Sequence, residues 1–305
     1  MRPANSVFLV FSVFVLATAT TAFGAEIGPS NGSLVVAGGG ISDPAIYERF
    51  ISLAGGPEAP IVVIPTAGSG ETYGNFWPGL QRLRDAGALN LTVLHTRDPE
   101  EADREDFVVP LREARGVWFS GGRQWRLADA YLGTRTLAEI RNVLERGGVV
   151  GGSSAGATIQ GSYLARGDTQ TNTIMMGDHT EGFAFLADVA IDQHLIQRNR
   201  HFDLVEVIDA HPELLGIGLD EDTAIVVRGD TFQVIGSGYV AIYDSTNVDG
   251  DGQWKFYFLA PGDRFDLGTR EPTRQTYSRE PFEHVIESPR KPQRAESNEE
   301  SPGVF

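Results

Sequence analysis

Short apolar runs alternate with longer mixed stretches along the first half of the chain. Continuous apolar runs of this kind are typical of parallel strands that are buried on both faces. The runs predict strands over residues 33–37, 61–65, 91–95 and 116–120. The stretches between and after them predict helices over residues 44–53, 75–86, 123–131 and 137–145. This alternation predicts an α/β fold, a three-layer αβα sandwich with a mostly parallel sheet.

Loops rich in small residues follow the predicted strands at their carboxyl ends. They occupy residues 38–40, 67–70 and 121–122, and a further apolar run at 148–151 leads directly toward Ser154. The carboxyl ends of parallel strands form the ligand crevice in sheets of this class. We therefore expect these loops and Ser154 to converge.

The pattern changes in the second half, where short turns separate apolar runs. Residues 216–227 and 231–243 are predicted strands, with hairpin turns at 228–230 and near Gly238. No linker rich in Pro, Gly or Ser divides the middle of the chain, so we expect a single α/β domain over residues 26–287, rich in hairpins from about residue 216. Residues 288–305 are polar and contain proline, which predicts a disordered tail.

The N-terminal segment has the pattern of a secretory signal peptide. Arg2 precedes an uncharged apolar stretch at 7–17, and small residues such as Ala22 and Ala25 follow it. The apolar stretch is short for a membrane span. We expect residues 1–25 to be a signal peptide and the mature protein to be secreted or periplasmic, with no membrane association.

Composition and charge narrow the function classes. The chain has 41 acidic and 25 basic residues, a formal charge of −16, whereas a nucleic-acid-binding protein needs a basic face. The acidic balance suits a soluble secreted protein and would also attract a cationic substrate. The chain contains no cysteine, which excludes disulfides, a thiol nucleophile and a thiolate metal site.

The run from Val150 to Ala157 carries the clearest chemical signal. Gly152-x-Ser154-x-Gly156 fits the nucleophile elbow, a strained strand-to-helix turn that lifts a serine hydroxyl above an α/β sheet. The glycines tolerate the turn, and the following helix start directs backbone N–H groups at developing negative charge. A phosphate-binding loop or a plain turn is the alternative interpretation.

A serine nucleophile needs a histidine base and an orienting acid. Of the six histidines, His194 is the first candidate, because it lies in a polar cluster flanked by apolar residues, and His179 is the second. The acid is Asp220, Glu221 or Asp222, and the residues alone do not decide among the three.

A metal site is the alternative use of these residues, and two observations argue against one. His194 has no second histidine at ligand spacing. Residues 247–252 resemble the first half of a calcium loop, but Phe258 stands where the closing carboxylate is expected, which favours a hairpin turn. We expect no metal and no cofactor.

Three motifs, in this order, resemble the cyanophycinase family. They are residues 151–157, residues 192–194 with 198–200, and residues 216–224. The family consists of serine exopeptidases related to peptidase E, with a flavodoxin-like fold akin to class I glutamine amidotransferases. The resemblance implies Ser154 as nucleophile, His194 as general base and Glu221 as the orienting acid. It also implies an oxyanion hole made by the N–H groups of Gly122 and Ala155.

The resemblance further implies a substrate pocket for β-linked Asp-Arg units. The implied pocket residues are Gln124, Asp192, Gln193, Arg198 and Arg200. The arginines would bind carboxylates, and Asp192 could receive the substrate guanidinium. The implied substrate is a peptide or a cyanophycin-like polymer, and the family implies a possible homodimer.

Two departures from the family pattern bear on specificity. Asp203 occupies the position where a further arginine is expected, and Trp125 follows Gln124. Two other functions therefore stay open. One is a serine peptidase or dipeptidase for other aspartyl or isoaspartyl peptides, and the other is a non-catalytic binding protein on the same scaffold.

Overall fold

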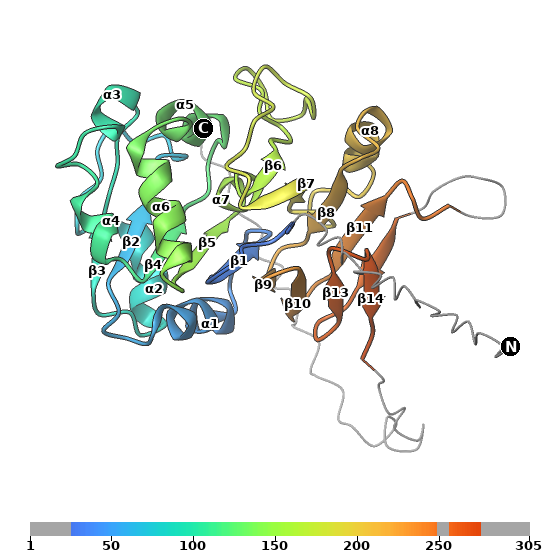
Figure 1. Ribbon diagram of the computed structural model, residues 1–305, viewed down its shortest axis with the longest axis horizontal. Helices are drawn as coiled ribbons and strands as arrows, with labels where there is room; N and C mark the ends of the chain where they lie inside the picture. Colours follow the sequence, from blue (N-terminus) through green and yellow to red (C-terminus); the bar gives the residue numbers. More distant parts are fainter. Residues whose placement is uncertain (1–25, 249–255, 276–305) are drawn as a thin grey trace, which may run out of the picture. The chain divides into compact units, whose positions relative to one another are not determined.

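The computed structural model describes residues 26–248 and 256–275. The predicted signal peptide, the tail from 288 and residues 249–252 of the calcium-like segment lie outside these ranges. The N-terminal half supplies five parallel strands in the order β1-β5-β4-β2-β3, with β3 at the left edge of Figure 1. Their bounds are β1 Ser33–Ala37, β2 Ile61–Ile64, β3 Leu91–Val93, β4 Gly116–Phe119 and β5 Val149–Ser153.

Helices cover both faces of this sheet because its strands are apolar on both sides. Val35 and Val63 pack with one group of helices, while their neighbours Leu34 and Val62 pack with the other. The first group is α1 Pro44–Ala54 and α2 Gln81–Asp85. The second is α3 Pro99–Ala102, α4 Val109–Glu113, α5 Trp125–Tyr131 and α6 Arg135–Glu145, of which α6 lies across the sheet in Figure 1. The predicted α/β sandwich is confirmed.

The helix predicted over 75–86 is shorter than expected. A 3₁₀ turn, Pro78–Leu80, precedes α2, which begins only at Gln81. Trp77 has ψ 126°, an extended conformation that proline imposes on the residue before it. Pro78 therefore delays the helix.

The second half of the chain builds two sheets. Four antiparallel strands extend the first sheet beyond β1, in the order β14-β13-β10-β9-β1. They are β9 Thr223–Arg228, β10 Thr231–Gly236, β13 Arg264–Asp266 and β14 Glu271–Thr273. The other strands form a separate five-stranded sheet in the order β12-β11-β8-β7-β6. They are β6 Gly161–Tyr163, β7 Leu186–Gln193, β8 Leu215–Leu219, β11 Val240–Asp244 and β12 Tyr257–Leu259.

This division confirms one predicted hairpin and corrects another. β9 and β10 pair antiparallel across the turn at residues 229–230, as predicted. The hairpin predicted near Gly238 is wrong, because β11 pairs with β8 in the second sheet and not with β10. The strand predicted over 216–227 is likewise two strands, β8 and β9, one in each sheet. The chain therefore crosses between sheets at residues 220–222 and again at 237–239.

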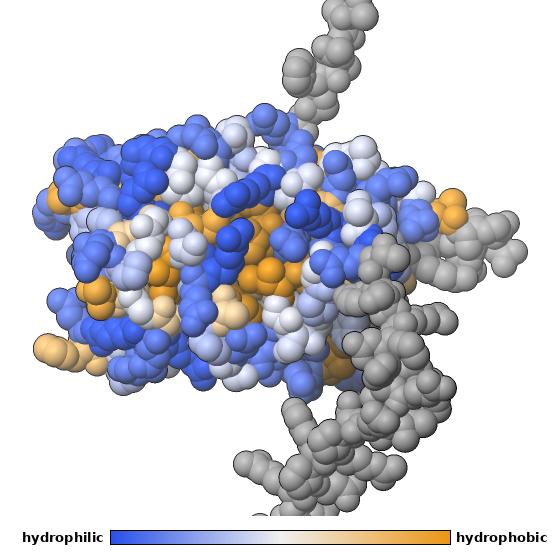
Figure 2. Space-filling model, turned by 90° about the horizontal axis from the view of Figure 1, so that it is seen from below, coloured by the Kyte–Doolittle hydropathy of each residue, from blue (hydrophilic) through white to orange (hydrophobic). Residues whose placement is uncertain are grey.

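Both sheets contribute to one apolar core. Val150 and Ile225 of the first sheet share it with Ile191 and Ile217 of the second, and helix α8, Asp203–Ala210, packs on the second sheet. Hydrophilic residues cover most of the face shown in Figure 2, with apolar residues visible between them near its centre. Within residues 26–248 and 256–275, no helix has the length and apolarity that a bilayer crossing requires.

Candidate active site

Ser154 lies in a strained turn between β5 and the short helix α7, Ala155–Thr158. Its backbone has φ 56° and ψ −117°, a conformation that a non-glycine residue adopts only when its surroundings impose it. Its N–H donates to the carbonyl of Ala37 at 3.0 Å. A Cβ atom at Gly152 would lie 2.3 Å from the carbonyl oxygen of Gly156. The glycines of the motif are therefore required by close backbone packing, as the elbow pattern predicts.

His194 reaches Ser154 from the end of β7. Its Nε2 lies 2.9 Å from Ser154 Oγ, and its side chain is 7% exposed. The loop at 38–40 fixes the imidazole from one side, because a Cβ at Gly39 would lie 2.4 Å from the His194 ring. The His194 N–H also donates to the carbonyl of Gly38 at 3.1 Å.

Glu221 completes the chain of hydrogen bonds. Its Oε1 accepts from His194 Nδ1 at 2.5 Å, and the carboxylate rests on Gly40, where a Cβ would lie 2.3 Å from it. A carboxylate only accepts, so Nδ1 carries the imidazole proton and Nε2 is left to accept the proton of Ser154 Oγ. This geometry distinguishes the three neighbouring acids that the sequence leaves open.

The two other acids and the second histidine have different partners. Asp220 accepts from the backbone N–H of Ile196 at 3.0 Å. Asp222 accepts from the N–H groups of Ser42 and Asp43 and from the Ser42 hydroxyl. His179 pairs through Nε2 with Asp129 at 2.7 Å.

The electrostatic surroundings keep His194 neutral. Burial lowers its pKa below the ordinary value of 6.5, the hydrogen bond to Glu221 opposes this, and the charge of Arg198 lowers it further. The neutral imidazole is the form that can accept a proton from serine. The arrangement therefore supplies a base that is ready at neutral pH.

The loops predicted to converge do meet around Ser154. A Cβ at Gly121 would lie 3.3 Å from Ser154 Cβ, and Gly122, with φ 147°, packs against the carbonyl of Ala67. Ala155 follows Ser154 at the start of α7. Both predicted oxyanion donors, Gly122 and Ala155, thus belong to segments in contact with the serine.

The structure corrects the role predicted for Asp192. Both of its oxygens are taken by the guanidinium of Arg166, at 2.8 and 3.0 Å, and neither side chain is accessible. Arg166 also pairs with Asp203, the residue that replaces the expected arginine. Asp192 therefore cannot receive a substrate guanidinium in this arrangement, because Arg166 already occupies it. No sequence motif indicated a role for Arg166. The one related sign in the sequence was the aspartate at position 203, where the family pattern predicts an arginine.

The remaining predicted pocket residues divide into supporting and accessible ones. Gln124 is buried, and its Nε2 donates to the carbonyls of Ala165 and Arg166 at 2.8 and 2.9 Å. Its amide nitrogen thus holds the Arg166 segment, while its Oε1 has no hydrogen-bond partner among the described residues. Gln193 is buried and accepts through Oε1 from Arg200 at 3.2 Å, whereas Arg198 is exposed.

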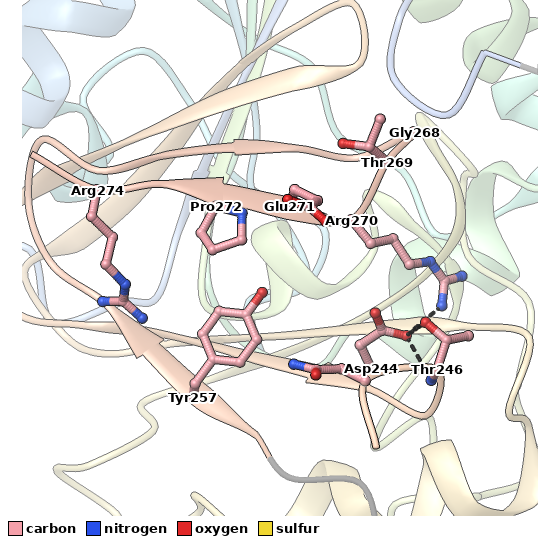
Figure 3. A pocket seen from close by; sticks show the side chains of 10 residues that line it. Asp244, Thr246, Tyr257, Gly268, Thr269, Arg270, Glu271, Pro272 and Arg274 are labelled. Carbon is pink, nitrogen blue, oxygen red and sulfur yellow. Dashed lines mark hydrogen bonds and ion pairs between the residues drawn. The ribbon is translucent and has the colours of Figure 1, made fainter. Parts of the chain in front are cut away.

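No group of three or more His, Cys, Asp or Glu side chains able to hold a metal occurs among the residues that the structure describes. A cavity of about 520 Å³ lies between β11, β12 and β14, and it contains none of the predicted site residues. In Figure 3, Arg270 points at Asp244 and forms an ion pair with it at 2.8 Å, while Tyr257 and Arg274 lie farther along the cavity. The predicted catalytic residues gather around Ser154 instead.

Comparisons of the sequence with known proteins all indicate a peptidase. A sequence model of peptidase family S51 matches residues 34–235. A cyanophycinase of Thermosynechococcus vestitus is 35% identical over 260 residues, which cover 78% of this chain and 80% of the relative. A cyanophycinase of Geminocystis herdmanii is 31% identical over 261 residues, with 79% and 95% coverage.

Several solved structures resemble this one. A peptidase from an acI-B1 Actinobacterium superposes with a TM-score of 0.59 at 27% identity, covering 78% of this chain and 98% of that one. A putative peptidase E protein from Listeria monocytogenes has a TM-score of 0.50 at 19% identity, covering 68% and 99%, and supports the fold alone.

Proposed function

The chain belongs to peptidase family S51, and from that premise we propose that it is a secreted serine exopeptidase that hydrolyses β-aspartyl-arginine linkages. The observation that carries the proposal is the hydrogen-bonded series Ser154–His194–Glu221, which begins at a strained strand-to-helix turn. Serine, histidine and a carboxylate in this arrangement perform acyl transfer on unrelated folds. The peptidase class is common to the family and its cyanophycinase relatives.

The proposed reaction starts with proton transfer from Ser154 Oγ to His194 Nε2 while Oγ attacks the carbonyl carbon of the substrate. Glu221 stabilises the resulting imidazolium, and the N–H groups of Ala155 and Gly122 receive the oxyanion. The C–N bond then breaks, and His194 returns the proton to the leaving amine. Water, deprotonated by His194, attacks the Ser154 ester and releases the acid product together with the free serine.

The proposed substrate follows from the relatives. Those at 31–35% identity are cyanophycinases, so a cyanophycin-like polymer and the release of β-Asp-Arg dipeptides come first. A second candidate is a peptidase for other aspartyl or isoaspartyl peptides. The ion pair of Asp192 with Arg166 favours it, because an occupied Asp192 leaves the substrate guanidinium without that partner.

Secretion and assembly are also part of the proposal. The signal-peptide pattern of residues 1–25 supports export to the periplasm or medium. The homodimer is proposed because the resemblance to the cyanophycinase family implies it. Detecting the mature N-terminus near residue 25 in the exported fraction, and the dimer by light scattering, would test these two points.

The experiment that tests the reaction uses the mature protein, Ser154→Ala and Ser153→Ala on insoluble cyanophycin, with released products identified by mass spectrometry. Ser153 is the matched control, since it is the adjacent serine at the end of β5. We expect Ser154→Ala to remain folded and lose roughly 10⁴-fold or more of the activity, by analogy with other serine peptidases. We expect Ser153→Ala to release β-Asp-Arg.

Other results would change the conclusion. If folded wild-type protein leaves cyanophycin intact but cleaves isoaspartyl dipeptides in a Ser154-dependent way, the second candidate is correct. If Ser154→Ala is as active as wild type, Ser154 is not the nucleophile and the mechanism is wrong.

A further inference from the structure

Three arginines gather at the carboxyl end of the central sheet, beside the turn that contains Gly122. Arg97 follows β3, Arg123 lies just before α5, and Arg126 lies in its first turn. A nitrogen of Arg97 and one of Arg126 donate to the same carbonyl oxygen, that of Gly68, at 2.8 and 2.7 Å. Because the two nitrogens share one acceptor, the distance between them is at most the sum of the two hydrogen-bond lengths.

Among the residues that the structure describes, each of these arginines is held by one or two backbone carbonyls and by no carboxylate. Arg97 donates to Gly68 and Gly70, Arg126 to Ala67 and Gly68, and Arg123 to Thr171. Each uses one terminal nitrogen, and in residues 26–248 and 256–275 no hydrogen bond uses its Nε or its second terminal nitrogen. The chain as a whole is acidic, with 41 acidic residues, so a cluster of three arginines is unusual in this molecule.

The crowding of positive charge has a cost. Burial lowers the pKa of Arg126, and the charges of Arg97 and Arg123 lower it further. Like charges held together repel unless a counter-charge joins them. The carbonyls fix the three side chains while their remaining donors stay available, as expected of a preformed anion site.

The cluster lies close to the serine along a continuous path of contacts. Gly121 packs against Ser154, and Gly122 packs against Ala67. The carbonyl of Ala67 accepts from the Arg123 N–H at 2.8 Å and from Arg126 at 3.1 Å. About three extended residues, at roughly 3.5 Å each, would cover such a path.

A cavity of about 480 Å³ lies beside Arg97, between the end of β3 and the loop at residues 71–73. Tyr73 and His95 line it, and their rings are in edge-to-face contact with the ring centroids 4.7 Å apart. Glu71 and Glu101 also line it, but the Glu101 carboxylate accepts from the Thr96 hydroxyl at 2.6 Å, and neither acid forms an ion pair with Arg97 among the described residues. The cavity leaves room for a substrate group beside Arg97, which is the member of the cluster that lines it.

We propose that Arg97, Arg123 and Arg126 form a carboxylate-binding subsite, which holds a free carboxylate of the peptide substrate about three residues or fewer from the bond cleaved at Ser154. A planar guanidinium binds a carboxylate through two parallel hydrogen bonds. Each β-aspartyl-arginine unit carries a free carboxylate on its arginine, so the polymer offers this group at every repeat. The subsite rests on the proposed function. It identifies the free carboxylate as the part of the substrate that these three arginines bind.

The test compares a short β-aspartyl-arginine oligomer with its carboxamide analogue, in which the free carboxylates are amidated. Kinetics are measured for wild type, Arg97→Gln, Arg126→Gln and the matched control Arg115→Gln. Arg115 is also an exposed arginine bonded to a backbone carbonyl, that of Arg146, but it precedes β4 at the opposite end of the strand.

We expect Arg97→Gln and Arg126→Gln each to raise KM for the carboxylate oligomer roughly tenfold, with kcat within about twofold of wild type. The same substitutions should leave KM for the carboxamide unchanged, because the neutral carboxamide forms no ion pair with the arginines. Arg97→Lys should recover part of the affinity, and Arg115→Gln should behave as wild type. Equal effects on both oligomers would overturn the subsite.

A binding measurement separates this proposal from the proposed function. Calorimetry with Ser154→Ala reports whether the carboxylate oligomer binds more tightly than its carboxamide, and whether adding Arg97→Gln removes the difference. A folded wild-type protein that hydrolyses neither oligomer refutes the proposed function alone. Binding that does not distinguish the two oligomers, or a difference that survives Arg97→Gln, refutes the subsite alone.

Discussion

Replacing Arg166 with methionine would leave the Asp192 carboxylate buried without its partner. Arg166 is 2% exposed and Asp192 is 1% exposed at the side chain, and both Asp192 oxygens accept from the guanidinium. Burial by itself would lower the pKa of Arg166, but its hydrogen bonds to Asp192 and Asp203 raise it above its usual value. Arg166 is therefore charged at neutral pH.

The magnitude follows from the burial of both charges. Removing one partner of a buried ion pair costs about 3–5 kcal/mol, mainly because the remaining charge stays desolvated. We expect Arg166→Met to lower the free energy of unfolding by about this amount, or the melting temperature by roughly 10 °C. Urea unfolding followed by circular dichroism would measure it.

The double variant Arg166→Met with Asp192→Asn is the control. It removes both charges, so we expect it to recover more than half of the stability lost in the single variant. Asp203→Asn should cost less than about 1 kcal/mol, since that carboxylate is 36% exposed and solvent screens its pairing. A loss below about 1 kcal/mol for Arg166→Met, or a double variant no more stable than the single one, would refute the reasoning.

Three further predictions concern the site and its loops. Because burial lowers the pKa of His194, the acidic limb of the kcat/KM profile should fall below pH 6.5, and a limb at or above 6.5 would contradict this. Gly39→Ala should abolish activity in a folded protein, because its Cβ would lie 2.4 Å from the His194 ring, whereas Gly74→Ala, with nothing within 4 Å, should be fully active. Burial opposes protonation of His179, but the carboxylates of Asp129 and Asp178 raise its pKa above 6.5, so its stabilising effect should be present below pH 6.5 and lost as pH rises through the raised value. The stability difference between wild type and Asp129→Asn, measured by urea unfolding from pH 5 to 8, should shrink with rising pH.

The parallel half of the fold could be predicted from local patterns because its strands are buried on both faces. The runs at 33–37 and 116–120 are continuously apolar, and the structure makes them β1 and β4. β7, by contrast, was not predicted, although it is the longest strand of the second sheet among the described residues. It ends in Asp192 and Gln193, whose side chains are polar but buried. The sequence of β7 therefore lacks the continuous apolar run by which a buried strand is predicted.

The candidate site shows the same division between local and distant information. Ser154 could be identified because its turn needs glycines within two residues, a constraint confined to one short segment. Asp192 was misjudged because its partner Arg166 is 26 residues away, in a segment with no pattern of its own. The pairing exists only once β7 and the loop after β6 are folded together, so no local spacing could predict it.

The crossing between the two sheets explains why Glu221, and not its neighbours, meets His194. β8 belongs to the second sheet and β9 to the first, so residues 220–222 must turn the chain from one sheet into the other. Asp222 has φ 50° in this turn, and its N–H donates to the carbonyl of Gly39 at 3.1 Å. This contact brings the turn against the same loop that fixes the His194 ring, with Asp220 directed to the segment after His194 and Asp222 to Ser42. Glu221, between them, is left facing Gly40 and His194 Nδ1. The change of sheet therefore decides which acid contacts His194, and a pattern of two apolar runs joined by three acids does not encode it.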